Sequence, residues 1–370
     1  MRTMPRWPTL VVALVVSLAA SPARAADDLA REAQLLVEGA LPARRAAIAR
    51  LEGWPEQPDG AQADRLLARA LRDDASLVRG AAAMALARRG ARGHLDAVRD
   101  ALGRESDPLA LAPLLGALGT LGFAGDGPRI NPHVLHPDAA VRRAAILALG
   151  DLDAPAAADV ARRLIVDPRG GDPGEGVRAA AALVLGRRGT AADGTWLIAR
   201  LADRTADPAP GWLLRSSMAE AIGRLGGEGA IAALTSLLGD PDARVAVTAA
   251  TGLAQRGARQ VLLGALGHAE PSVRAAAVGG VLQGRVRDGY PVIASLARRD
   301  PSRDVRWAAT SALWKLEMRE ADAYVLEALG ASDPGIVLAA HHLLVERVGS
   351  DLRLDVDAWK AALARWWQRR

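Results

Sequence analysis

Residues 136–152 read HPDAAVRRAAILALGDL, and copies of this segment recur along the chain. Close copies begin at Asp73, Gly174, Asp240, Glu270 and Asp300, and weaker ones at Leu41, Ser106, Pro210 and Asp333. The residue before the recurring arginine position marks each unit: Ala43, Val78, Ala110, Val141, Val177, Leu214, Val245, Val273, Val305 and Val337. Successive markers are 28 to 37 positions apart. The sequence therefore predicts about ten repeats of roughly 33 residues each.

Each repeat has the pattern of two short helices. An Asp-Pro pair or an equivalent opens the unit, and an Asp or Ser side chain then caps the free amides of a helix. In the 136–152 copy, Val141, Ala145 and Leu149 form one apolar stripe at helical spacing. Glycine ends this helix because it readily adopts the left-handed conformation. Second helices are expected at 94–102, 156–166, 192–201, 228–238, 291–297 and 320–329.

A single helix pair of this kind cannot cover its own apolar face, whereas stacked pairs bury a common core. No segment alternates apolar and polar residues as a half-exposed strand does. We therefore predict an all-α fold, a right-handed α-solenoid of about ten two-helix repeats. The pattern D-P-x-x-V-R-x-x-A-x-x-A-L-G resembles the short HEAT-like repeats found in phycobilisome lyases. This resemblance covers nearly everything after the first 25 residues, and it implies a fold but little chemistry.

Residues 1–25 have the pattern of a cleavable secretory signal peptide. Arg2 and Arg6 precede an apolar run over 10–20, and Ala23-Arg24-Ala25 forms a small-residue cleavage site. A membrane-spanning helix needs about 20 apolar residues, and the run over 10–20 is shorter than that. We therefore expect cleavage near Ala25, and retention as an anchor is the open alternative. We expect a bacterial periplasmic or secreted protein with no stable membrane insertion after cleavage.

The composition excludes several classes of function. The chain has no cysteine, so it has no disulfide, thiolate nucleophile or cysteine-based zinc site. With one Phe and two Tyr, the core must consist of Ala, Leu and Val. The formal net charge is +5, and Arg2, Arg6 and Arg24 belong to the segment that we expect to be removed. The remaining arginines alternate with many acidic residues, which makes nucleic acid an unexpected partner.

The two ends differ from the repeat array, which is expected over residues 41–350. Residues 26–40 form a predicted capping helix, and residues 351–370 form a second one. In the latter, Trp359, Leu363, Trp366 and Trp367 share one face, which favours sealing of the last repeat over waiting for a partner. Two segments rich in Gly and Pro, 123–137 and 166–176, are predicted to be loops without helix.

One row of arginines follows the marker positions: Arg79, Arg142, Arg178, Arg215, Arg274 and Arg306. Acidic residues precede most of them: Asp73, Asp138, Glu175, Glu270 and Asp304. The resemblance to HEAT-like repeats implies a structural ladder, in which each arginine bridges to an acidic residue of its own or the adjacent unit. The arginine is missing at Leu111 and Leu338, so the ladder is expected to be interrupted there.

A second row lies in the later helices: Arg69, Arg99, Arg163, Arg200 and Arg299. Cations near a helix C-terminus complement its partial negative charge, which is one explanation. The other is that second helices line the concave surface of such solenoids, so that the row could bind an acidic protein segment or another anionic ligand. Arg99, Arg163, Arg200 and Arg299 are therefore candidate partner-binding residues.

Two tryptophans inside the repeats are further candidates. Trp196 and Trp212 stand where neighbouring units carry smaller residues, and Trp212 follows a Pro-rich stretch. An exposed Trp ring is the side chain most enriched in binding hot spots. Burial between repeats is the alternative explanation for both.

No catalytic, metal or cofactor site is expected. His133 and His136 share one loop, but no third ligand lies at metal-binding spacing. The His-Glu pairs of the HEAT-repeat hydroxylases that bind di-iron do not occur in this sequence. Ser216 and Ser217 lack the Gly-x-Ser-x-Gly turn of a hydrolase, and residues 223–229 lack the strand that precedes a phosphate-binding loop.

We predict an exported, non-enzymatic scaffold or adaptor that binds a protein or peptide on its concave face. The alternative is an enzyme or cofactor handler similar to the phycobilisome lyases, with an anionic ligand such as a tetrapyrrole on the concave arginine row. A third possibility is nucleic-acid binding, as in HEAT-like DNA glycosylases, which the predicted signal peptide opposes.

Overall fold

The computed structural model describes residues 22–56, 59–166, 171–203, 210–331 and 334–369, and these contain helices but no β-strand. The predicted all-α class is therefore confirmed. Of the predicted signal segment, all but 22–25 lies outside the described residues. The chain divides into two compact units, residues 1–122 and 123–370, and the division falls at the start of the first Gly- and Pro-rich segment.

Unit 1 contains the helix that precedes the array, the first two repeats and the first helix of the third, whose second half lies in unit 2. Its helices are α1 (Pro22–Glu38), α2 (Leu41–Glu52), α3 (Gly60–Ala70), α4 (Ser76–Arg88), α5 (Leu95–Arg104) and α6 (Pro108–Leu121), with a 3-10 turn, η1 (Arg92–His94), before α5. Helices α2, α4 and α6 pack side by side, and α1 packs on α2 and α3. Leu29 of α1 is fully buried, and Glu32 of the same helix pairs with Arg50 at 2.6 Å.

Unit 2 contains the remaining seven repeats. Their first helices are α8 (Ala139–Asp151), α10 (Glu175–Arg188), α12 (Trp212–Leu225), α14 (Ala243–Gln255), α16 (Pro271–Gln283), α18 (Arg303–Lys315) and α20 (Pro334–Val348). Their second helices are α9 (Ala157–Ile165), α11 (Ala191–Ala202), α13 (Ala230–Leu237), α15 (Arg259–Ala265), α17 (Tyr290–Arg299), α19 (Glu320–Ala328) and α21 (Val356–Gln368). A short turn, η4 (Arg287–Gly289), precedes α17.

The repeat pattern of the sequence places these helices correctly. All ten marker residues fall in the first helix of a repeat, and the six expected second helices begin and end within two residues of the predicted positions. Asp107, Asp138 and Asp242 cap first helices by accepting hydrogen bonds from backbone amides. The α-solenoid prediction is thus confirmed at the level of its repeats.

The backbone turns left-handed directly after many first helices. Glycine takes this position at Gly90 and Gly257, with φ of 62° and 67°. Asp153 and Glu317 take the same position in other repeats, each with φ of 55°. The predicted glycine is therefore one solution of a geometric requirement that other residues also meet, at the cost of some backbone strain.

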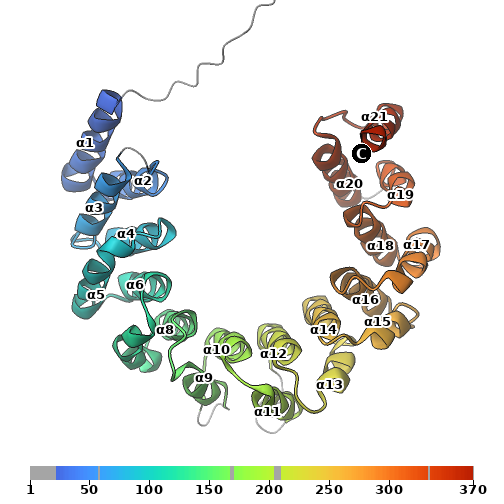
Figure 1. Ribbon diagram of the computed structural model, residues 1–370, viewed down its shortest axis with the longest axis horizontal. Helices are drawn as coiled ribbons and strands as arrows, with labels where there is room; N and C mark the ends of the chain where they lie inside the picture. The colour runs from blue at the N-terminus through green and yellow to red at the C-terminus, as the bar shows by residue number, and fades with distance from the viewer. Residues whose placement is uncertain (1–21, 57–58, 167–170, 204–209, 332–333, 370) are drawn as a thin grey trace, which may run out of the picture. The chain divides into compact units, whose positions relative to one another are not determined.

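Unit 2 curves toward its first helices, which corrects the expectation that second helices line the concave surface. In this unit the first helices lie on the inner side of the curved stack and the second helices on its outer side (Figure 1). Successive first helices pack closely because small residues face one another, as Gly186 faces Ala221 and Gly223 faces Gly252. The second helices contact one another less, so their side of the stack is longer.

The prediction that Gly and Pro exclude helix from residues 123–137 is wrong. This segment folds into three short helical turns, η2 (Ala124–Asp126), α7 (Gly127–Ile130) and η3 (Asn131–Leu135). Pro128 and Pro132 stand in the first turn of their helices, where a missing amide proton costs nothing. In the second segment, α10 already begins at Glu175, and residues 167–170 lie outside the described residues.

The predicted arginine ladder is present, with partners different from the acidic residues that precede each arginine. Arg79 pairs with Glu105, Arg215 with Asp240, and Arg274 with Asp300, at 2.6, 2.7 and 2.7 Å. Arg142 pairs with Asp172 in the same way. Each carboxylate lies 25 to 30 positions later, in the turn that leads to the next repeat. The arginine therefore spans its own repeat from one turn to the next.

Five ladder arginines also hold the turn in front of them: Arg79, Arg142, Arg215, Arg274 and Arg306. Arg274 donates hydrogen bonds to the carbonyl oxygens of His268 and Ala269, at 2.8 and 2.7 Å. Arg306 does the same with Asp300 and Pro301, at 2.8 and 3.2 Å. The turn at Asp300 is therefore held through its side chain by one arginine and through its backbone by the next.

In two repeats that lack the arginine, the acidic residue of the following turn is missing as well. Leu111 replaces the arginine in one repeat and Ala246 in another, and the turns that follow carry His136 and His268. The Nδ1 atoms of these histidines accept a hydrogen bond from the amide two residues later, at 3.1 Å, as the ladder carboxylates do. Histidine keeps the turn without leaving a buried carboxylate unpaired.

The last helix covers the end of the array. Trp359 of α21 is fully buried and its indole nitrogen donates to the carbonyl oxygen of Arg353 at 2.8 Å. Trp367 donates to Asp322 of α19 at 2.7 Å, and Arg347 of α20 lies 5.1 Å from the centre of the Trp366 ring. These contacts hold α21 against α19 and α20.

Substitution of Arg274 by Ala should lower the free energy of unfolding of unit 2 by about 3 kcal/mol, because Asp300 would stay buried without its cation. Arg299→Ala should change it by less than about 0.5 kcal/mol, because this side chain is exposed. Urea denaturation measures both variants. Equal losses of unfolding free energy in the two variants would contradict a structural ladder. The double variant Arg274→Met with Asp300→Leu should recover most of the loss seen in Arg274→Ala.

The ladder should also make the fold sensitive to acid. Hydrogen bonds from Arg79 and Arg274 lower the pKa of Glu105 and of Asp300. Their contribution to stability is full above the unfolded-state pKa values, about 4, and is lost as the pH falls through the lower folded-state values. The melting temperature should therefore fall more steeply below pH 5 in the parent than in Arg274→Met with Asp300→Leu. Parallel curves would contradict this.

Substitution of Trp359 by Ala should open the C-terminal end alone, because each repeat contacts only its neighbours. Hydrogen exchange should become faster in α20 and α21 and stay unchanged in α8 and α10. Trp366→Ala, which removes a half-buried ring, should have a smaller effect. Uniform loss of protection across unit 2 would contradict independent sealing of the end.

Candidate binding surface on the second helices

The second arginine row lies on separate second helices, and its members differ in exposure. Arg69 of α3, Arg163 of α9 and Arg299 of α17 are exposed, whereas Arg99 of α5 and Arg200 of α11 are half-buried. Four of the five, all but Arg99, stand in the last turn of their helices, where they complement the helix dipole.

The half-buried members have local partners. Arg99 pairs with Asp96 on its own helix at 2.8 Å. Arg200 lies 3.8 Å from Asp203, and its guanidinium is 6.0 Å from the centre of the Trp196 ring. Trp196 is half-buried in this contact. Arg163 borders a hollow that also contains the ladder pair Arg142–Asp172, and so it faces a neutralised surface. The structure therefore does not gather Arg163, Arg200 and Arg299 into one site.

Trp212 begins a first helix, α12, and 37% of its surface is exposed. The guanidinium of Arg244 stacks on its ring, 3.3 Å from the centre. Arg244 in turn pairs with Asp242 at 2.7 Å, and this hydrogen bond lowers the pKa of Asp242 to about 2. Trp212 is therefore partly covered by its own chain and lies apart from Trp196.

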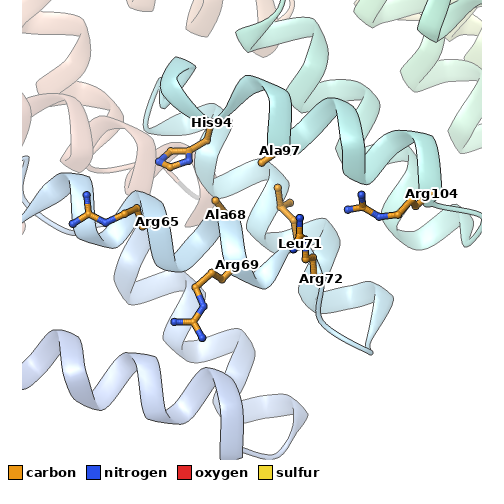
Figure 2. A pocket seen from close by; sticks show the side chains of 8 residues that line it. All are labelled: Arg65, Ala68, Arg69, Leu71, Arg72, His94, Ala97 and Arg104. Carbon is orange, nitrogen blue, oxygen red and sulfur yellow. The ribbon is translucent and has the colours of Figure 1, made fainter.

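A groove between α3 and α5 gathers cations more densely than the row does (Figure 2). Arg65, Arg69 and Arg72 come from α3 and the residues just after it, and Arg104 ends α5. His94 joins them, and Ala68, Leu71 and Ala97 form the apolar part of the lining. The groove has a volume of about 610 Å³. All four arginines are exposed.

The charge of this groove is not neutralised from within. Its lining includes no carboxylate, and none of its four arginines forms an ion pair with a residue that the structure describes. Of the nearby acids, Asp64 pairs with Arg89, Asp73 with Arg44 and Asp96 with Arg99, whereas Asp100 of α5 is exposed and lies outside the lining. The groove therefore presents four guanidinium groups to solvent.

A second, smaller hollow adjoins the groove on the other side of α3. It lies between α1 and α3, has a volume of about 150 Å³, and shares Arg69 and Arg72 with the groove. Leu36 and Val37 of α1 contribute apolar surface, and Val37 is 72% exposed. Asp73 is the acidic member of this lining and is paired with Arg44.

The sequence contains a signal for the groove that the search for repeats overlooked. Arg65, Arg69 and Arg72 follow the i, i+4, i+7 spacing of one helix face in RLLARALR. Because this spacing lies within one helix, a comparison of equivalent positions between repeats does not reveal it. Arg104 and His94 carry no such signal, because only the packing of α5 beside α3 brings them to the groove.

The structure places the residues considered for catalysis in different elements, His133 in η3 and Ser216 in α12. Within the described ranges no group of three His, Asp or Glu residues is placed to hold a metal ion. Burial lowers the pKa of His133, and nearby His136 lowers it further. Ser216 shares a hydrogen bond with the Thr248 hydroxyl on the neighbouring helix at 2.9 Å.

Comparison with known proteins identifies the repeats. A family model described as HEAT repeats matches residues 133–210, 205–278 and 260–345, more than half of the chain. No curated protein matches the sequence. Among the helices that the structure describes, none combines the length and apolar character needed to cross a membrane.

Several solved structures resemble the fold. Human deoxyhypusine hydroxylase in complex with glycerol is 21% identical, with 80% of this chain and 97% of that chain covered and a TM-score of 0.32. The complex of CpcE and CpcF of phycocyanin lyase from Nostoc sp. is 21% identical, with 76% and 92% covered and a TM-score of 0.34. The Kap95:Nup1 complex is 14% identical, with 94% and 52% covered and a TM-score of 0.48. These similarities concern the fold alone.

Proposed function

Because the chain belongs to the HEAT-repeat family, we propose that it is an exported, non-enzymatic scaffold or adaptor that binds another protein. The observation that carries the proposal is the groove between α3 and α5, where four arginines have no carboxylate among the lining residues. Exposed cations held on a rigid helical frame favour recognition of a partner, since each guanidinium presents several donors without having to reorganise.

The fold supports a recognition role over a catalytic one. Solenoids expose long surfaces built from equivalent helices, and such surfaces suit extended partners. Several described histidines and acids serve turns, caps and the ladder, as His136, Asp138 and Asp300 do. Export rests on the pattern of residues 1–25.

The proposed binding surface is the second-helix face of unit 1 and not a concave row along the array. In unit 2 the second helices lie on the outer side of the curve, and their arginines are dispersed or locally paired. Unit 1 concentrates the same kind of residue on two neighbouring helices. The higher density of positive charge at the α3–α5 groove favours it as the binding location.

Crosslinked affinity capture from the cell envelope tests this function. The parent chain should enrich one protein that Arg65→Gln with Arg72→Gln fails to enrich, while Arg163→Gln with Arg299→Gln enriches it normally. Mass spectrometry of the purified chain should find an N-terminus near Ala26. A chain with residues 1–25 intact in the cytoplasm would contradict export. Capture that is equal for all three chains, or absent for the parent, would contradict a partner at this groove.

A further inference from the structure

The geometry of the groove points to one class of partner segment. It is an extended stretch with an acidic residue at every second position and an apolar side chain next to the acids. We infer that this segment lies along α3, with its carboxylates on the four arginines of the groove, Arg65, Arg69, Arg72 and Arg104. The inference rests on the proposed function and specifies what the partner presents to that site.

Charge is the first argument for an acidic segment. The groove exposes four guanidinium groups and one imidazole, and the neighbouring carboxylates of Asp64, Asp73 and Asp96 are already paired. Arginine binds carboxylates through two parallel hydrogen bonds, which gives direction as well as attraction. A bound carboxylate would therefore replace water without displacing an existing ion pair.

The spacing of the arginines supports an extended conformation. In Figure 2 Arg65 and Arg104 lie toward opposite ends of the groove, with Arg72 between them, and the guanidinium groups do not converge on one point. Along α3, Arg65 and Arg69 are separated by about 6 Å and Arg65 and Arg72 by about 10 Å. Alternate residues of an extended chain lie about 6.6 Å apart on the same side. Acids at every second position therefore match the distance between Arg65 and Arg69, and Arg72 and Arg104 extend the row of cations beyond them.

The apolar surface beside the arginines explains the expected neighbouring residue. Ala68, Leu71 and Ala97 line the groove, and Leu36 and Val37 line the hollow on the far side of Arg69 and Arg72. Val37 is largely exposed. A segment that crosses the ridge formed by Arg69 and Arg72 would place one side chain against α1. Burial of that side chain would favour a mixed acidic and apolar segment over a purely acidic one.

The lining disfavours nucleic acid as the occupant. Proteins that bind single strands stack the bases on aromatic rings, and here the lining residues are Arg, Ala and Leu with a single His. Duplexes need a wider field of positive charge, whereas Asp96 and Asp100 lie on the same α5 helix. A short carboxylate-rich segment needs neither aromatic stacking nor a field of positive charge wider than the groove.

Fluorescence anisotropy with the purified protein tests the inference. The probes are a labelled peptide of alternating Glu and Ala that carries one Leu, the same peptide with Gln for Glu, and a labelled single-stranded oligonucleotide of equal charge. At low salt the parent should bind the Glu peptide at least about tenfold more tightly than the Gln peptide and the oligonucleotide.

Two double variants of equal charge separate the groove from general electrostatics. Arg65→Gln with Arg72→Gln should weaken binding of the Glu peptide about tenfold, and Arg163→Gln with Arg299→Gln less than about twofold. All four positions are exposed, so the melting temperature should stay unchanged in both variants. Equal weakening by both variants would overturn the inference. Tighter binding of the oligonucleotide, lost in the groove variant, would overturn it in favour of nucleic acid.

The apolar contact has its own test. Val37→Ser should weaken binding of the peptide that carries Leu. It should leave binding of the Leu→Ser version of that peptide unchanged. No difference between the two peptides would remove the apolar part of the inference.

The result is separable from that of the proposed function. Peptide binding at the groove without a captured envelope protein would overturn the function and leave the chemistry of the groove in place. A captured partner whose binding depends on Arg65 and Arg72, together with no affinity for the Glu peptide, would overturn the acidic segment and leave the scaffold function in place.

Discussion

The structure depends on a guanidinium that is shared by two successive turns. Arg274 illustrates it: one side of the group holds the backbone carbonyls of the turn before its helix, and the other holds the carboxylate of Asp300 in the turn after its repeat. Because Arg306 then holds the backbone of that same turn, the register of one repeat is passed to the next. The buried apolar residues supply the hydrophobic stabilisation, which is non-directional, whereas the hydrogen bonds fix the direction of stacking.

This constraint explains which helices are free to bind. The ladder and the small residues keep the first helices close together, as at Gly223 against Gly252, and their side chains go into the core and the turns. The second helices contact one another less and leave shallow grooves between them. Surface residues there are under fewer packing constraints. A binding function can therefore be placed on α3 and α5 without loss of the repeat geometry.

The sequence predicts the repeated helix pairs well because each pair depends on local signals such as the caps at Asp138 and Asp242. It misplaces features that depend on contacts across a repeat. The ladder partner of Arg79 is Glu105 and not a nearby acid, because the second helix brings the chain back to the same turn. The direction of curvature follows from many close contacts between first helices, which no single repeat encodes. Of the residues in the groove, Arg65, Arg69 and Arg72 can be recognised in the sequence by their helical spacing. Arg104 cannot, because only the packing of α5 beside α3 brings it there.

Arginine has two roles in this chain, and the distinction lies in what each guanidinium faces. A ladder arginine meets a carboxylate that its own chain supplies, and where the arginine is lost the carboxylate is replaced by histidine, as at His136. At these turns the replacement avoids a buried carboxylate without a counter-charge. The α3–α5 groove departs from it: Arg65, Arg72 and Arg104 are exposed and meet no carboxylate among the described residues. Water solvates these charges in the free protein, so they cost the fold little and remain available to a counter-charge from outside the chain.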